Sequence, residues 1–260
     1  MAYAETADED IDGRHSISLE EANEYMNAVQ SLTRKIARAG VLFILSPVCL
    51  ILFGGLSDCL GVLTDDMAGG IGVVILLAVI AVGIAIVIPC GMKLEKYEYI
   101  EKEPITLQYG VQGIVEKKKH DYEPTYRRAL VAGVLLCISG VIPLFLAVAF
   151  GLSEFILILC LDLMLILIAG GVYTLLLPVC VYESYQKLLQ EGDYTEERKR
   201  IRTKIDFFPG AYWLIVVAVY LGLSFYYENA WDRTWIVWPV AGVLFAAIYG
   251  ILEGFAKNKK

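Results

Sequence analysis

The chain has 260 residues, of which 57% are hydrophobic, and its mean hydropathy is +0.59. A soluble domain with this composition could not cover its core with polar side chains, so the composition indicates a membrane protein. The 22 basic and 29 acidic residues give a net charge of −7. They are concentrated outside a set of long apolar segments.

Six apolar segments of roughly 17 to 28 residues each are long enough to cross a ~30 Å hydrocarbon core as helices. Because they are apolar on all sides rather than at every second residue, we predict an all-α polytopic membrane protein. Its six transmembrane helices would form three hairpins, joined by cytoplasmic amphipathic helices. The predicted spans are residues 36–56, 70–92, 129–151, 155–182, 211–227 and 235–252.

The chain then divides into alternating polar and membrane regions. Ser18 followed three residues later by Glu21 is a capping box, and the apolar spacing after it predicts one long helix running into the first span. Pro104 and Gly110 predict a break in the second connection. The acidic start of the chain does not fit a cleavable signal peptide. The predicted regions are an acidic segment and lead helix at 1–33, hairpins at 34–92 and 129–182, connections at 93–128 and 183–210, and a last hairpin with a basic tail at 211–260.

The distribution of Lys and Arg predicts the orientation. Of the 22 cations, 21 lie before or at the entrance of the first span, between spans 2 and 3, between spans 4 and 5, or at the chain end; Arg233 is the exception. Basic residues stay on the cytoplasmic side of short loops, so we expect both termini in the cytoplasm. Trp213, Trp231 and Trp235 lie near the ends of the last two spans, where we expect them to act as interfacial anchors.

The first two hairpins carry an internal repeat. Residues 34–53 and 127–146 match at seven of twenty positions, with the shared string AGVL followed by S-x-V. In each copy, a charged segment precedes the first helix of a predicted hairpin. We therefore interpret hairpins 1 and 2 as duplicated units in parallel orientation.

Asp162 is the acid placed most clearly inside a predicted span. It lies about 10 Å from the outer end of that helix, where no span offers a cation at the same depth. An unpaired carboxylate is costly in hydrocarbon, so we expect Asp162 to be protonated or to face a hydrated crevice. It is either a proton or cation site or, as we favour, a residue hydrogen-bonded to a neighbouring helix.

A stripe of small residues runs along the sixth span. Gly242, Ala246, Gly250 and Gly254 recur every four residues, a pattern that lets another helix approach closely. This stripe fits packing within the bundle or, alternatively, a homodimer seam. The basic connections similarly fit either anionic lipid binding or a solvated face, and interleaved acids favour the second reading.

The sequence lacks the residue patterns that several kinds of catalytic or binding site require. His15 and His120 form no zinc-binding pattern, no predicted span holds a base for a serine nucleophile, and there is no phosphate-binding Gly-rich loop. We therefore expect no catalytic residues, no metal and no cofactor. We interpret the six cysteines as small apolar side chains that fill space between helices. Cys59 and Cys160 lie near the outer face, where a disulfide between them is an alternative.

The strings SLEEANEY, LSPVCLIL, LEKYEYIEKEPITLQYGV and FFPGAYWLIVVAVYLGLSF carry a family resemblance. The chain resembles the membrane region of helix-turn-helix regulators and permease-prefix-like proteins of Gram-positive bacteria over most of residues 16–250. This resemblance implies a multi-pass protein of the bacterial cytoplasmic membrane. About 35 residues precede the first span, fewer than a three-helix DNA-binding domain with its linker needs, so we expect no direct contact with nucleic acid.

The sequence favours a non-enzymatic membrane sensor or scaffold that signals through its cytoplasmic segments. The alternative is a small transporter, or a membrane subunit of a transport system, with Asp162 on the path. The expected partners are the lipid bilayer, a cytoplasmic regulator or a transport ATPase encoded nearby, and a second copy of the chain.

Overall fold

The computed structural model describes residues 14–60, 64–205, 207–226 and 231–258. Within these residues, six helices are long and apolar enough to cross a membrane, as a multi-pass membrane protein requires. The predicted all-α fold is confirmed, with two short strands in addition. The chain divides into two compact units: the first takes in residues up to 100 and 105–189, and the second takes in 101–104 and 190–260.

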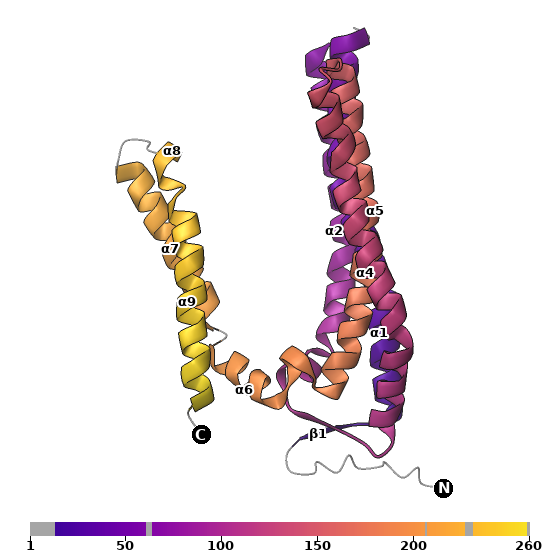
Figure 1. Cartoon of the computed structure of the whole chain (residues 1–260), viewed down its shortest axis with the longest axis vertical. Helices are drawn as coiled ribbons and strands as arrows, with labels where there is room; N and C mark the ends of the chain where they lie inside the picture. The colour runs from indigo at the N-terminus through magenta and orange to yellow at the C-terminus, as the bar shows by residue number, and fades with distance from the viewer. Residues whose placement is uncertain (1–13, 61–63, 206, 227–230, 259–260) are drawn as a thin grey trace. The chain divides into compact units, whose positions relative to one another are not determined.

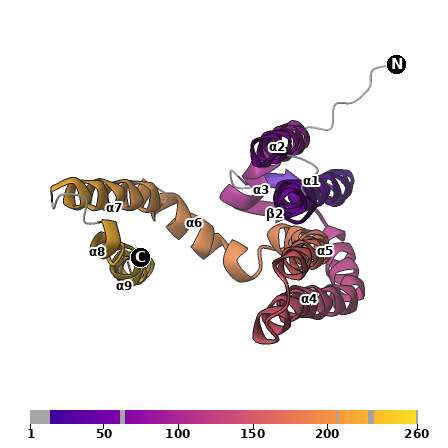
Figure 2. The same cartoon turned by 90° about the horizontal axis from the view of Figure 1, so that it is seen from above.

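The first unit is built on four long helices, α1 (Leu19–Leu60), α2 (Asp65–Glu95), α4 (Val111–Ala149) and α5 (Glu154–Leu189). Helix α1 packs against both α2 and α5, and α5 also packs against α4. The four helices therefore form a row in the order α2, α1, α5, α4 (Figure 2). The two hairpins of the predicted repeat lie next to each other in this row.

The long lead helix predicted from the capping box is confirmed. Helix α1 begins directly after Ser18, whose Oγ accepts a hydrogen bond from the Glu21 amide at 3.2 Å. The Glu21 side chain does not return to Ser18 but accepts hydrogen bonds from other parts of the chain. Only half of the predicted capping box is thus formed.

The second connection is broken where Pro104 and Gly110 predicted a break. A short helix α3 (Glu98–Lys102) is followed by strand β2 (Ile105–Leu107), which pairs in parallel with strand β1 (His15–Ile17). Gly110 then has φ +83°, a left-handed conformation that glycine adopts without strain, and α4 begins at the next residue. The strand pair was not predicted.

The second unit holds the last two apolar helices. A single turn of 3-10 helix, η2 (Gly192–Tyr194), leads into α6 (Glu196–Ile205), the amphipathic segment expected before the fifth span. Helix α7 (Phe207–Tyr226) and helix α9 (Val237–Asn258) pack against each other, with the short α8 (Trp231–Thr234) between them in the chain (Figure 1). Helix α6 also packs against α9.

Candidate functional site

Asp162 is buried two turns into α5, with 6% of its surface exposed. Both carboxyl oxygens are buried, and neither has a hydrogen-bond partner among the described residues. Ile158, one turn earlier, lies directly over Gly55 of α1, so this face of α5 is turned toward α1. The favoured hydrogen bond to a neighbouring helix is therefore not formed among the described residues.

The lack of a hydrogen-bond partner restricts the charge state that the Asp162 carboxyl can adopt. A bare carboxylate in hydrocarbon is costly, so Asp162 must be neutral or must share its charge with a proton or cation that enters from solvent. Among the described residues, no group of three or more His, Cys, Asp or Glu side chains is placed to hold a metal ion.

A close helix contact in the first unit lies between α4 and α5, at Gly133 and Gly171. An added Cβ on Gly133 would lie 3.0 Å from the Gly171 carbonyl oxygen, and one on Gly171 would lie 2.9 Å from the Gly133 carbonyl oxygen. The two backbones approach closely here, and the Leu175 and Cys137 side chains pack over the two glycines. Gly171 belongs to a run of small residues at 169–171, and the structure shows that this run is closely packed.

The small-residue stripe of α9 behaves differently. A Cβ added at Gly242, Gly250 or Gly254 would meet no heavy atom of the described chain within 4 Å, and Ala246 is exposed. Within the second unit, therefore, no helix packs on this stripe. Its prediction as a packing surface, whether in the bundle or in a homodimer, stays open.

The predicted tryptophan anchors have different surroundings. Trp213 stacks on Trp238 with ring centroids 6.2 Å apart, so it belongs to the contact between α7 and α9. Trp235 is 59% exposed, as an interfacial side chain would be. The side chain of Trp231 lies outside the described residues, and so does that of Cys59. Cys160 carries a free thiol.

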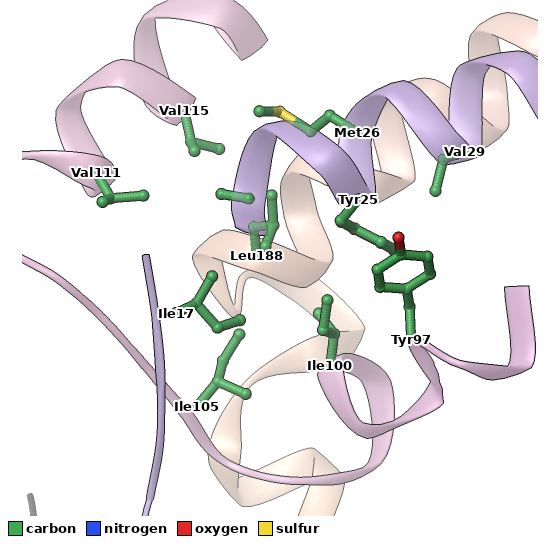
Figure 3. Close-up of a cluster of buried hydrophobic side chains, with 11 residues drawn as sticks. Ile17, Tyr25, Met26, Val29, Tyr97, Ile100, Ile105, Val111, Val115 and Leu188 are labelled. Carbon is green, nitrogen blue, oxygen red and sulfur yellow. The ribbon is translucent and has the colours of Figure 1, made fainter. Parts of the chain in front are cut away.

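Sequence reasoning missed a buried cluster at one end of the first unit, here called the basal cluster (Figure 3). It brings together side chains from both strands, from α3, and from the ends of α1, α4 and α5. Its members are Ile17, Ala22, Tyr25, Met26, Val29, Tyr97, Ile100, Ile105, Val111, Val115 and Leu188. The apolar spacing of 19–32 predicted the α1 part, but nothing local marked its partners.

Polar side chains tie the rim of the basal cluster. Tyr97 donates a 2.8 Å hydrogen bond to Glu24, and Tyr99 donates a short one to Glu21. His15 lies 3.2 Å from the same Glu21 carboxyl. Burial, together with the hydrogen bonds to these carboxylates, raises the pKa of both tyrosines. The phenols therefore stay neutral and keep donating at physiological pH.

No protein-family model, curated protein or solved structure matches the chain. Asp162, the basal cluster and the distribution of charge are therefore the features of the chain that point to a function.

Proposed function

We propose that the chain is a non-catalytic sensor or scaffold of the bacterial cytoplasmic membrane, with both termini in the cytoplasm. The observation that carries this proposal is the basal cluster. Three predicted spans extend past their apolar segments and end in one buried core with the N-terminal strand and the 97–107 segment. A tilt or shift of α1, α4 or α5 must therefore repack that core, because close-packed interiors do not deform continuously.

This arrangement suits relay of a membrane state to a cytoplasmic partner. The partner would be a regulator encoded nearby, in keeping with the resemblance to membrane regions of helix-turn-helix regulators. The strand pair supplies an output element, since β1 holds only three residues and is retained by Ile17 and its pairing with β2. Few contacts are needed to release such an element.

The test measures coupling between membrane and cluster. The full chain is placed in nanodiscs of short-chain and long-chain lipids, because hydrophobic mismatch tilts spanning helices. Amide exchange at 15–17 and 105–107 should change by at least about threefold between the two thicknesses, a change of roughly 0.65 kcal/mol in local opening. Leu188→Ala, which truncates the buried α5 member of the cluster, should reduce this response.

Leu130→Ala is the matched control, since Leu130 is 39% exposed on α4 and lies outside the cluster. The relay proposal fails if exchange in the spans changes with thickness while exchange at the two strands stays the same. It also fails if both leucine variants respond alike.

The proposed orientation has its own test. A membrane-impermeant thiol reagent should modify Cys59 in intact cells, whereas Lys118→Cys or Arg200→Cys should react only after the membrane is opened. Reaction of either engineered cysteine in intact cells would reverse the topology.

A second candidate function is proton-coupled transport, supported by the buried carboxyl of Asp162 and its lack of a hydrogen-bond partner in the described chain. In that case Asp162→Asn should abolish pH-dependent uptake into vesicles while leaving the fold intact, because the amide keeps the volume but carries no exchangeable charge. Uptake that Asp162→Asn leaves unchanged would remove this candidate.

A further inference from the structure

The second unit contains a cavity of about 350 Å³ between α6 and α9. It is lined by two arginines, two acids, two tyrosines and one isoleucine: Asp193, Tyr194, Arg198, Ile201, Arg202, Tyr249 and Glu253. Arg198 and Arg202 are one turn apart on α6, so both guanidinium groups come from the same face of that helix.

The packing of α7 against α9 fixes the depth of this cavity. Phe208, at the start of α7, stacks on Phe245 of α9 with ring centroids 6.0 Å apart. Tyr249 and Glu253 follow Phe245 by four and eight residues, or about 6 and 12 Å further along the helix. They therefore lie beyond the first residues of the neighbouring apolar helix. In a membrane crossed by α7 and α9, the cavity lies at the level of the lipid headgroups.

The lining carries balanced charge. Arg198 contacts Asp193 at 2.7 Å, and Arg202 contacts Glu101 at 3.1 Å, each through one terminal nitrogen. A guanidinium has five N–H donors, so each arginine can still donate to a ligand. For Glu253, no ion pair or hydrogen bond is found within the described part of the chain. With two cations against two acids on its wall, the cavity offers no net attraction to a simple anion.

We infer that this cavity binds the headgroup of a phospholipid that carries both a phosphate and a primary ammonium group, as phosphatidylethanolamine does. Arg198 and Arg202 receive the phosphate, and Glu253 accepts hydrogen bonds from the ammonium group. The acyl chains then run along the exposed apolar surfaces of α7 and α9, where Leu214 is 73% and Val243 is 72% exposed. This site is independent of the basal cluster and of the proposed relay.

Native mass spectrometry of the full chain in detergent tests this site, with phosphatidylethanolamine, phosphatidylglycerol and phosphatidylcholine as probes. Phosphatidylethanolamine should bind best, because the glycerol headgroup lacks a cation and the choline headgroup has no N–H donor. Glu253→Gln and the double variant Arg198→Gln, Arg202→Gln should each weaken its binding about tenfold, as loss of a charge-assisted hydrogen bond does.

Arg200→Gln is the matched control, since Arg200 is exposed on the same helix and does not line the cavity. If the double arginine variant unfolds because its ion pairs are lost, Glu253→Gln still decides the question. Preference for phosphatidylglycerol, equal binding of phosphatidylcholine, or an equal loss in Arg200→Gln would overturn the inference. Displacement of the lipid by equimolar soluble phosphoethanolamine would also overturn it, in favour of a soluble ligand.

Discussion

The two units hold their helices together by different means. In the first unit, glycines bring helices into contact: Gly133 meets Gly171, and Gly83 of α2 lies against the edge of the Phe43 ring of α1. In the second unit, rings fill the space between α7 and α9, as Trp213 does against Trp238.

The two units also differ in how polar side chains in their apolar helices form hydrogen bonds. In the second unit, the Tyr212 hydroxyl donates to the Ala241 carbonyl oxygen at 2.6 Å, and Ser224 and Thr234 share a 2.7 Å hydrogen bond. In the first unit, serines in the apolar helices bond their own helix, as Ser46 does to the Phe43 carbonyl oxygen at 2.8 Å. Lipid supplies no hydrophobic drive between helices, so either close backbone packing or interhelical hydrogen bonds must hold them. In the first unit, close packing at Gly133 and Gly171 is accompanied by a weak contact of the Cys137 thiol with the Ile168 carbonyl oxygen, whereas in the second unit hydroxyl hydrogen bonds join the helices.

The largest expected effect is at Gly171. An alanine there would press its Cβ into the Cys137 thiol and the Gly133 carbonyl oxygen, and backbone cannot yield as a side chain can. We expect Gly171→Ala to destabilise the protein by about 2 kcal/mol, measured as thermal unfolding in detergent. Gly69→Ala is the control, because a Cβ there meets nothing within 4 Å. Equal melting temperatures for the two variants would show that α4 and α5 are not in backbone contact.

Gly83→Ala should have a smaller effect, about 1 kcal/mol, because its Cβ meets the edge of the Phe43 ring rather than backbone. The second copy of the repeat carries Leu136 where the first carries Phe43. Phe43→Leu should therefore recover part of the loss in a double-mutant cycle. Additive effects of the two changes would mean that Phe43 and Gly83 are not in contact.

In the second unit, the contribution of Lys199 to stability should be smaller than that of the glycine contacts and should depend on pH. Lys199 is buried on α6 and donates to the Glu103 carbonyl oxygen at 2.8 Å, and burial lowers its pKa from 10.5 to about 8. Between pH 8 and 10.5, Lys199 is protonated in the unfolded chain but largely deprotonated in the folded one, so the unfolded chain binds more protons. The contribution of Lys199 to the free energy of unfolding therefore rises with pH over this range.

The measurement is the melting temperature of the wild type minus that of Lys199→Met, at pH 7 and at pH 9. This difference should increase at pH 9, because the cost of burying the charge is then partly removed. A difference that falls with pH would show that Lys199 is held as a charged ion-pair partner instead.

Gly250→Leu should have the smallest effect, within about 0.5 kcal/mol, because the stripe on α9 faces open space in its own unit. Leu252→Phe serves as the comparison on the same helix. A marked loss of stability in Gly250→Leu alone would show that another helix covers the stripe. Loss of a dimer in size-exclusion chromatography would identify that helix as belonging to a second copy.

The sequence alone determined the features that depend on neighbouring residues. Six apolar segments predicted the six long helices, Ser18 predicted where α1 begins, and Pro104 with Gly110 predicted the break before α4. Each of these follows from local hydropathy, capping or backbone conformation. The sequence also identified Asp162 as an acid in a costly position.

Only the tertiary structure decided which distant residues meet. The pairing of Ile17 with Leu107 joins segments 90 residues apart, and the basal cluster brings together side chains from both strands and from α1, α3, α4 and α5. The AGVL repeat marked Gly40 and Gly133 as equivalent, yet the alignment could not show that an added Cβ is tolerated at Gly40, 3.6 Å from Leu176, and not at Gly133. Periodicity fixes the face of a helix but not its partner or its distance, because helix packing is set by side chains on both surfaces. For the same reason, the absence of a hydrogen-bond partner for Asp162 in the described chain became visible only once α1 and α5 were packed.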